Sequence, residues 1–194
     1  GGSAPVIVAP DADARAAGRL AAQRKAANAG QICVAPNRFY VHETGQDAFA
    51  AGFAEAARKI RIGDPREEAT QMGPLATGRQ RDRMEHLVEA ASRAGAEIVV
   101  GGSRPRGIKA GFHFEPTLLA GATDDMAVMA EEIFGPIAPL ATFADLDEAI
   151  ARANATDMGL SAFAFTRDAA TAARLREGLQ AGMIGITTMA FGRP

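Results

Sequence analysis

The chain has 194 residues, of which 47% are hydrophobic and 23% charged, a composition typical of a folded domain and unlike that of a disordered chain. Its formal net charge of −2 provides no overall positive field for nucleic acid or an anionic membrane, and the lack of Trp disfavours base stacking. The single cysteine, Cys33, excludes an internal disulfide and a multi-cysteine metal site.

Strand and helix signals alternate along the chain. Short apolar, β-branched runs predict strands at 5–8, 38–42, 97–100, 116–119, 137–143, 162–165 and 183–186. Capping residues (Asp13 and Thr44 in the first two cases) and apolar side chains at helical spacing predict helices at about 11–27, 44–60, 77–93, 145–153 and 168–179. A turn-rich stretch is expected at 63–73, and Pro139 favours an edge position or a bend for its strand. The alternation predicts one α/β domain of three layers, a largely parallel sheet with helices on both faces.

No targeting signal is visible in the sequence. The start of the chain lacks the basic and apolar regions of a secretory leader, and no run approaches the roughly 18 apolar residues of a membrane helix. We therefore expect a cytoplasmic protein with no membrane partner.

Cys33 is the sharpest candidate for chemistry. It ends the string Asn28-Ala29-Gly30-Gln31-Ile32-Cys33, between a predicted helix and a predicted strand. Loops at the carboxyl ends of elements in open α/β sheets bind ligands, and a thiolate is a strong nucleophile. Gly30 lets the backbone approach a substrate closely. From composition alone, a small buried hydrophobic cysteine is the commoner alternative.

The second candidate is the string Glu131-Glu132-Ile133-Phe134-Gly135-Pro136. A carboxylate can accept both hydroxyls of a ribose, and an aromatic ring two residues later can pack against a flat heterocycle. The alternative is a solvated acidic pair at the end of a short helix, with Phe134 in the core.

The two strings together, in this order and at this separation, resemble the catalytic domain of the aldehyde dehydrogenase superfamily. The resemblance spans nearly the whole chain. Its further landmarks are Pro5-Val6-Ile7-Val8 with Asp11-Ala12-Asp13, Gly73-Pro74-Leu75, Phe114-Glu115-Pro116-Thr117-Leu118, Asn154 with Gly159-Leu160, and Gly182-Met183-Ile184-Gly185-Ile186.

The resemblance implies a mechanism. Cys33 would attack an aldehyde to form a thiohemiacetal, hydride would pass to NAD or NADP, and water would hydrolyse the resulting thioester to the acid. The backbone N–H of Cys33 would donate to the oxyanion. Glu132 would hold the nicotinamide ribose and Phe134 would border the nicotinamide.

The remaining residues of the cysteine string also acquire implied roles. Ile32 and Val34, on either side of the nucleophile, would line the tunnel for a small-molecule aldehyde. Asn28, Gly30 and Gln31 support the motif. No metal site is implied.

The resemblance also predicts that residues 1–194 are a fragment. The family's Glu-Leu-Gly-Gly string, which supplies the general base, would end at Gly1-Gly2, unless Gly1-Gly2-Ser3 is a remnant of cloning. The oxyanion Asn, the Rossmann-like domain that makes most cofactor contacts, and the C-terminal oligomerisation strand would also lie outside the chain. We expect the isolated fragment to be inactive and the full-length chain to form a homo-oligomer.

The sequence is similar to those of the succinate-semialdehyde dehydrogenase branch, and it differs from them at two positions. That branch has an Arg six residues before the nucleophile, where this chain has Ala27, and its substrate-binding Ser corresponds to Gly192. Both argue against succinate semialdehyde, although Arg193 could replace the charge. A medium aliphatic or aromatic aldehyde is equally open. The branch's second, regulatory cysteine is Ala35 here.

Two other function classes stay open. A cysteine acyl-transferase or thiol hydrolase would need a histidine base beside Cys33, from among His42, His86 and His113. The third possibility is a non-catalytic binding or assembly module. The histidines have no metal-ligand spacing, and we expect each to be a surface or strand residue.

Overall fold

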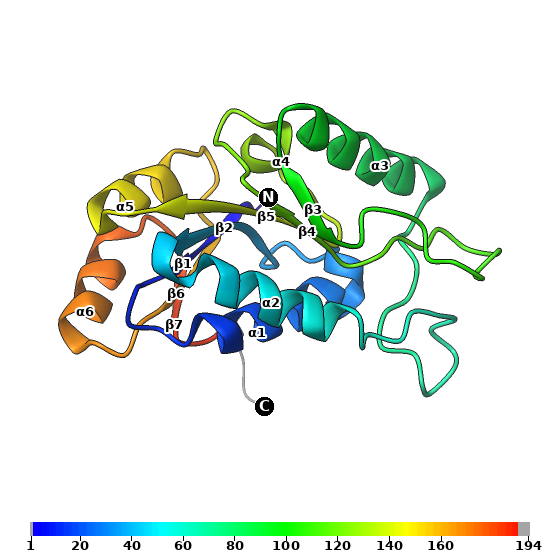
Figure 1. Cartoon of the computed structure of the whole chain (residues 1–194), viewed down its shortest axis with the longest axis horizontal. Helices are drawn as coiled ribbons and strands as arrows, with labels where there is room; N and C mark the ends of the chain where they lie inside the picture. Colours follow the sequence, from blue (N-terminus) through cyan, green and yellow to red (C-terminus); the bar gives the residue numbers. More distant parts are fainter. Residues whose placement is uncertain (1, 190–194) are drawn as a thin grey trace.

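The computed structural model describes residues 2–189 and contains a seven-stranded sheet in the order β3-β4-β5-β2-β1-β6-β7 (Figure 1). The strands are β1 (Ala4–Val8), β2 (Pro36–His42), β3 (Glu97–Val100), β4 (Thr117–Ala120), β5 (Ile137–Phe143), β6 (Ser161–Phe165) and β7 (Met183–Ile186). The α-helices are α1 (Ala14–Ala26), α2 (Gln46–Ala57), α3 (Gly78–Arg93), α4 (Ala127–Ala130), α5 (Leu146–Asn154) and α6 (Ala169–Gly178), with 3₁₀ turns at Ala27–Gly30 and Glu43–Gly45.

The sheet is largely parallel, as predicted. β1 pairs in parallel with β2 and β6, β5 pairs in parallel with β2 and β4, and β7 pairs in parallel with β6. Only the β3–β4 pair is antiparallel among the described strands. β1 is therefore an interior strand, and β3 and β7 are the outermost strands of the described sheet.

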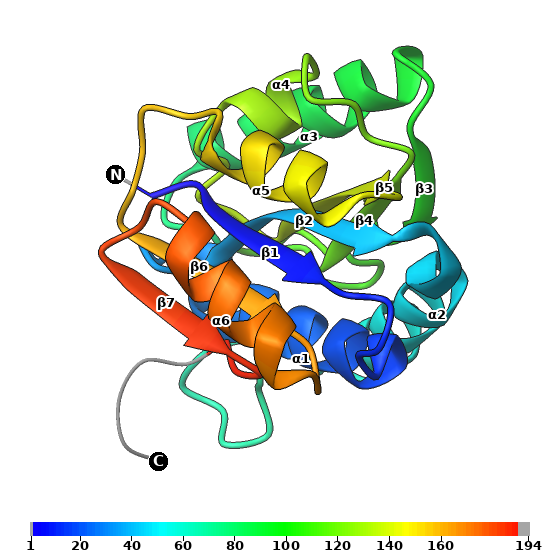
Figure 2. The same ribbon diagram turned by 90° about the vertical axis from the view of Figure 1, so that its left-hand side faces the viewer.

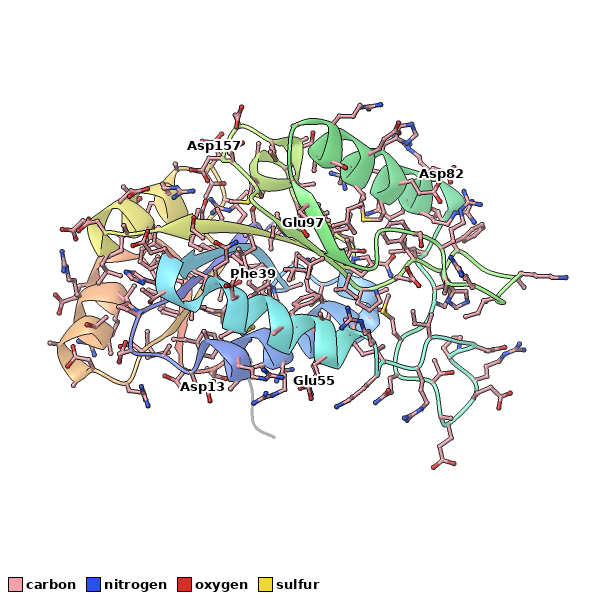
Figure 3. The ribbon with its side chains drawn as sticks, viewed as in Figure 1. Asp13, Phe39, Glu55, Asp82, Glu97 and Asp157 are labelled. Carbon is pink, nitrogen blue, oxygen red and sulfur yellow. The ribbon has the colours of Figure 1, made fainter. Side chains whose placement is uncertain are left out.

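Helices cover both faces of the sheet, and the sheet separates the hydrophobic core into two parts. Along β1, Val6 and Val8 pack into the core beneath α1 and α2, whereas Ile7 points into the opposite core. Figures 1 and 2 show α1 and α2 on one side and α3, α4 and α5 on the other. Phe39 lies between the sheet and α2, while Glu55 projects from the outer surface of α2 (Figure 3). The period-two alternation of the strands therefore produces the three predicted layers.

Most predicted helix starts are confirmed. The side chains of Asp13, Thr77, Asp145 and Asp168 each accept a hydrogen bond from a backbone N–H in the first turn of the helix that follows. Thr44 is an exception, because it lies inside the 3₁₀ turn that precedes α2, and its hydroxyl is 2.8 Å from Nδ1 of His42.

The prediction of an edge strand from Pro139 was wrong. β5 lies inside the sheet, between β4 and β2. Pro139 is tolerated because its register partner is Leu119 of β4, and the pairing of β5 with β2 begins only at Leu140. At Pro139 the strand therefore needs hydrogen bonds on one side only.

The parallel strands define two edges of the sheet. We call the segments 2–3, 28–35, 131–136 and 155–160, which precede β1, β2, β5 and β6, the amino edge. The segments 9–13, 43–45, 144–145 and 166–168, which follow the same strands, are the carboxyl edge. In Figure 2, β1 and β7 run from the left, where the N-terminus lies, toward the lower right.

Cys33 and Glu132 both belong to the amino edge. The argument that placed Cys33 in a ligand-binding loop at the carboxyl ends of elements is therefore corrected. Its loop follows the carboxyl end of a helix but precedes a strand.

None of the helices within residues 2–189 has the length and apolar character needed to cross a membrane.

Candidate active site

Cys33 lies on a tight turn at the amino edge. The N–H of Ala35 donates to the carbonyl oxygen of Ile32 at 2.9 Å, which closes a four-residue turn with Cys33 in its second position. The side chain of Cys33 is exposed. Its backbone N–H has no hydrogen-bond acceptor among residues 2–189. The alternative of a buried cysteine is therefore excluded, and the sulfur and the N–H have no partner within the described residues.

A left-handed stretch of backbone leads into this turn. Asn28, Ala29 and Gly30 have φ values of 49°, 53° and 73°, a conformation that non-glycine residues rarely adopt. The side chain of Asn28 donates to the carbonyl of Gln31, and that of Gln31 donates to the carbonyl of Asn28, each at 3.0 Å. These reciprocal bonds stabilise the strained segment, which accounts for the residue types in the motif.

Gly30 permits the two candidate strings to meet. A Cβ atom at Gly30 would lie 2.2 Å from the carbonyl oxygen of Gly135, so only glycine fits this approach. The side-chain oxygen of Gln31 also accepts a hydrogen bond from the N–H of Ala76 at 2.8 Å. The cysteine string thus contacts the Glu131–Pro136 string and is bonded to Ala76, the residue after the Gly73-Pro74-Leu75 segment.

Gly2 links Cys33 to Glu132. Its N–H donates to Oε1 of Glu132 at 2.9 Å. A Cβ atom at Gly2 would lie 2.0 Å from the carbonyl oxygen of Cys33. One residue therefore contacts the backbone of the cysteine and orients the carboxylate. Oε2 of Glu132 has no hydrogen-bond partner in the part of the chain that the structure describes.

Phe134 lies at the surface, which corrects the alternative that placed it in the core. Its side chain is 40% exposed and its φ is 51°. The left-handed backbone turns the ring outward, and Ile133 beside it is buried instead.

Helix α3 holds the Glu131–Pro136 string in place. Nε2 of Gln80 donates to the carbonyl of Phe134 at 2.8 Å. The guanidinium of Arg83 donates to the carbonyls of Ile133 and Glu132 and to the carboxylate of Glu131, at 2.6, 3.0 and 2.8 Å. Sequence reasoning missed both residues. Their only signal was their position one helical turn apart on the same face of a predicted helix.

Asn37 was missed as well. This residue of β2 is buried, and its side-chain amide donates to Oγ of Ser3 and to the carbonyl of Glu131, both at 3.2 Å. It joins the starts of β1, β2 and the Glu131–Pro136 string, so the amino edge is a single connected unit.

Ile32 and Val34 border one hollow beside the cysteine turn, with a volume of about 130 Å³. The other residues that line it are Arg24, Ala27, Ala35, Pro36, Phe163 and Met189. Ile32, Val34 and Ala27 thus border the same hollow; that Ile32 and Val34 line the tunnel for the aldehyde stays a prediction. The predictions for Gly192 and Arg193 lie outside the described residues.

The three histidines lie at the end of β2, in α3 and in the loop before β4. His42 ends β2, a strand of seven residues that begins three residues after Cys33 and spans about 20 Å. Nδ1 of His86 is hydrogen-bonded to the carbonyl of Asp82. His113 is buried in the loop before β4, contrary to the prediction of a surface or strand residue, and burial lowers its pKa although Asp64 opposes this. No histidine within residues 2–189 hydrogen-bonds Cys33, and no cluster there could hold a metal ion.

Comparison with known proteins agrees with this geometry. All of residues 1–194 match the family described as "Aldehyde dehydrogenase family". The chain belongs to the aldehyde dehydrogenase family.

Among its relatives, a betaine aldehyde dehydrogenase of Brucella anthropi is 42% identical over 94% of this chain and 38% of its own length. The succinate-semialdehyde dehydrogenase [NADP(+)] of Mycolicibacterium paratuberculosis is 42% identical over 100% of this chain and 41% of its own length. A crystal structure of an Escherichia coli NADP-dependent enzyme superposes with a TM-score of 0.94 at 38% identity, covering 100% of this chain and 40% of that one. The chain thus spans about two fifths of the length of these aldehyde dehydrogenases.

Proposed function

We propose that this chain contributes the nucleophile and the nicotinamide-side contacts of an enzyme that oxidises an aldehyde to a carboxylic acid with NAD or NADP. The observation that supports the proposal most directly is the exposed thiol of Cys33, tied through Gly2 to the carboxylate of Glu132. An accessible nucleophile and a ribose-binding carboxylate on one rigid edge are what thiol-mediated hydride transfer requires.

The chemistry begins with a covalent bond to sulfur. The thiolate of Cys33 attacks the carbonyl carbon, and the carbonyl oxygen takes the negative charge of a thiohemiacetal. The free N–H of Cys33 lies on the same residue and can donate to that oxygen, a contact worth roughly 3 kcal/mol of barrier in a site that excludes water. Loss of hydride from the former carbonyl carbon leaves a thioester on Cys33. Water then cleaves this thioester to the carboxylic acid and restores the thiol.

Glu132 and Phe134 fit the nicotinamide half of the cofactor. The oxygen of Glu132 that is not bonded to Gly2 can accept from ribose hydroxyls, and Phe134 presents an exposed aromatic side chain for a flat ring to cover. When bound, the nicotinamide accepts the hydride. Gln80 and Arg83 hold these residues through the backbone, so we assign them a positioning role.

The names of the relatives do not choose the substrate. The two relatives at 42% identity are named for betaine aldehyde, which carries a quaternary ammonium cation, and for succinate semialdehyde, which carries a carboxylate. Because the chain is equally identical to both, these identities do not favour either charge on the substrate.

We also place the protein in the cytoplasm, where an exposed free cysteine stays reduced. A homo-oligomer is the assembly we propose. β7 is the last strand of the sheet and has β6 as its only strand partner within residues 2–189, so its outer edge is open to pairing with a second copy.

The test uses the protein expressed from its complete gene. With a panel of aldehydes, we expect formation of NADH or NADPH at 340 nm, and an acyl group on the Cys33 peptide by mass spectrometry after rapid quenching. Cys33→Ala should lower kcat at least about a thousandfold. Cofactor reduction that survives Cys33→Ala would refute the role of Cys33. Acyl transfer without any cofactor reduction would favour a cysteine acyl-transferase, and ligand binding without turnover would favour a binding module.

A further inference from the structure

His113 is a buried side chain that the proposed reaction does not use. It lies in the loop before β4, it is only 6% exposed, and its Nδ1 is buried without a hydrogen-bond partner within residues 2–189. Buried polar atoms are usually hydrogen-bonded, because leaving one unpaired costs free energy. Stability alone therefore does not explain an imidazole at this position.

A hollow of about 330 Å³ lies directly beside His113. It forms where the loop after α2 meets the loop before β4, at the right of Figure 1. Among the described residues that line it, Asp64 is the one ionisable residue besides His113. A hydrogen bond from the guanidinium of Arg66 lowers the pKa of Asp64 to about 2, so this carboxylate stays charged in mild acid. The imidazole thus borders an open space that also contains a negative charge.

The loop that carries His113 is linked to the cysteine string by hydrogen bonds. The carbonyl of Phe112, the residue before His113, accepts from the N–H of Leu75 at 3.0 Å. The next residue, Ala76, donates its N–H to Oε1 of Gln31 at 2.8 Å. Gln31 in turn exchanges hydrogen bonds with Asn28 in the left-handed segment before Cys33. A movement of the His113 loop therefore acts on the support of the cysteine turn.

Neutral and protonated imidazole differ in what they require at Nδ1. The neutral ring carries one N–H, so Nδ1 can remain without a proton, whereas the imidazolium carries an N–H on both nitrogens. Burial lowers the pKa of His113, although the charge of Asp64 opposes this. The cations nearby offer no acceptor: Arg66 pairs with Asp64, and Arg81 lies over the ring of Phe112 at 5.6 Å. The charged ring is therefore stable only if it leaves its buried position.

We propose that His113 is a positioning residue for the cysteine turn. The neutral ring holds the loop before β4 in place, and the protonated ring moves into the hollow and weakens the hydrogen bonds that lead through Leu75 and Ala76 to Gln31. The hold on the turn does not depend on the reaction. Its consequence, a loss of aldehyde oxidation in mild acid, rests on the proposed function.

Hydrogen exchange tests the proposal on the protein expressed from its complete gene. The protection factors of the Leu75 and Ala76 amides, corrected for intrinsic exchange at each pH, are compared between pH 7.5 and pH 5. An exposed imidazole has a pKa of about 6.5, so opening of the loop should become about five- to fifteenfold more favourable over this range. The protection factors should fall by the same factor, because exchange reports the open population.

Two variants separate His113 from other effects of acid. His113→Phe keeps a flat ring but takes up no proton, so its amide protection should not change with pH. His86→Phe is the matched control, since His86 is exposed on α3 and its Nδ1 is bonded to the carbonyl of Asp82; here the fall in protection should persist. Unchanged protection in the original chain, an equal fall in His113→Phe, or no fall in His86→Phe would overturn the proposal.

A second measurement needs no variant. Exchange of the carbon-bound ring hydrogen of His113, followed by mass spectrometry, gives its titration midpoint. Amide protection should fall between a pH of about 6.5 and this midpoint and then level off; a fall outside that interval would refute the coupling. Aldehyde oxidation with unchanged amide protection would refute the role of His113 alone, whereas pH-dependent protection without aldehyde oxidation would refute the proposed function alone.

Discussion

At the carboxyl edge, the carboxylate of Asp11 accepts hydrogen bonds from the hydroxyl of Thr166 and from the N–H groups of Arg167 and Asp168, at 2.6 to 3.0 Å. Beside the amino edge, at the end of α1 and the start of β6, Nε of Arg24, Nζ of Lys25 and Oγ of Ser161 are buried and have no partner within residues 2–189. Asp11 is therefore satisfied within the chain, whereas these three polar groups are not.

We infer from this difference that the sheet keeps stability and the proposed chemistry at opposite edges. Open α/β sheets usually bind ligands beyond the carboxyl ends of their strands, but here the carboxylate of Asp11 at those ends is already bonded within the chain. The amino edge contains the left-handed backbone of Asn28, Ala29 and Phe134 and the exposed thiol, and the unpaired groups lie beside it. At the carboxyl ends of the strands, Thr187 after β7 is the one left-handed residue other than glycine within residues 2–189. Strain and unpaired groups of this kind are retained where function requires them.

Lys25 provides the strongest test of the inference that unpaired groups beside the amino edge lower the stability of the fold. It is fully buried at the end of α1, and burial lowers its pKa from 10.5 to about 7. Between pH 7 and 10.5 the unfolded chain therefore holds a proton that the folded chain does not, so this residue makes folding less favourable as the pH falls through that range. Replacement by an apolar side chain of similar length should remove the penalty. We expect Lys25→Met to raise the free energy of unfolding by about 2–4 kcal/mol at pH 7.

Urea denaturation at pH 7 and pH 9 measures the effect. The advantage of Lys25→Met over the original chain should shrink to about half at pH 9, because less of the unfolded lysine is protonated there. Lys59→Met is the matched control, since Lys59 is exposed and pairs with Glu55; it should change stability by less than about 1 kcal/mol at either pH. A destabilised Lys25→Met, or an advantage that does not vary with pH, would show that the lysine has a partner in the folded chain.

Gly30→Ala tests the close contact between the cysteine string and the Glu131–Pro136 string at the amino edge. An added Cβ would lie 2.2 Å from the carbonyl oxygen of Gly135, at a φ of 73°. Strain and overpacking together should cost about 2–3 kcal/mol and displace the cysteine turn. Gly121 has nearly the same φ, 72°, with nothing within 4 Å of an added Cβ. Gly121→Ala should therefore cost only about 1 kcal/mol and leave the alkylation rate of Cys33 unchanged. Equal costs for the two variants would mean that the Gly30–Gly135 contact is not required.

The elements themselves could be predicted because their signals are local. Strand alternation and the capping side chains of Asp13, Asp145 and Asp168 depend on neighbouring residues, and they agree with the structure. The chemistry at Cys33 and Glu132 was predicted from two strings whose contact could only be inferred from a family resemblance.

What failed depended on contacts between distant segments. Pro139 was expected at an edge or a bend because the sequence does not say which strands flank β5. The support of the Glu131–Pro136 string by Gln80 and Arg83 depends on how α3 docks, which no local pattern encodes. The same holds for His113, whose burial depends on how the loop before β4 lies against Asp64 and Pro74.

Asp11→Asn tests whether the two edges are independent. Burial opposes ionisation of this carboxylate, but the hydrogen bonds from Arg167, Thr166 and Asp168 outweigh it and lower the pKa below its usual value of 3.8. The ionised carboxylate thus stabilises the fold above that pH, and the contribution is lost as the pH falls through the lowered pKa. We expect Asp11→Asn to cost about 1–2 kcal/mol at pH 7, because the amide cannot accept all of these donors. The alkylation rate of Cys33 should not change, since the length of β2 separates the two edges. A slower reaction at Cys33 would instead show that strain at the amino edge is held in place from the carboxyl edge, through the central strands that join them.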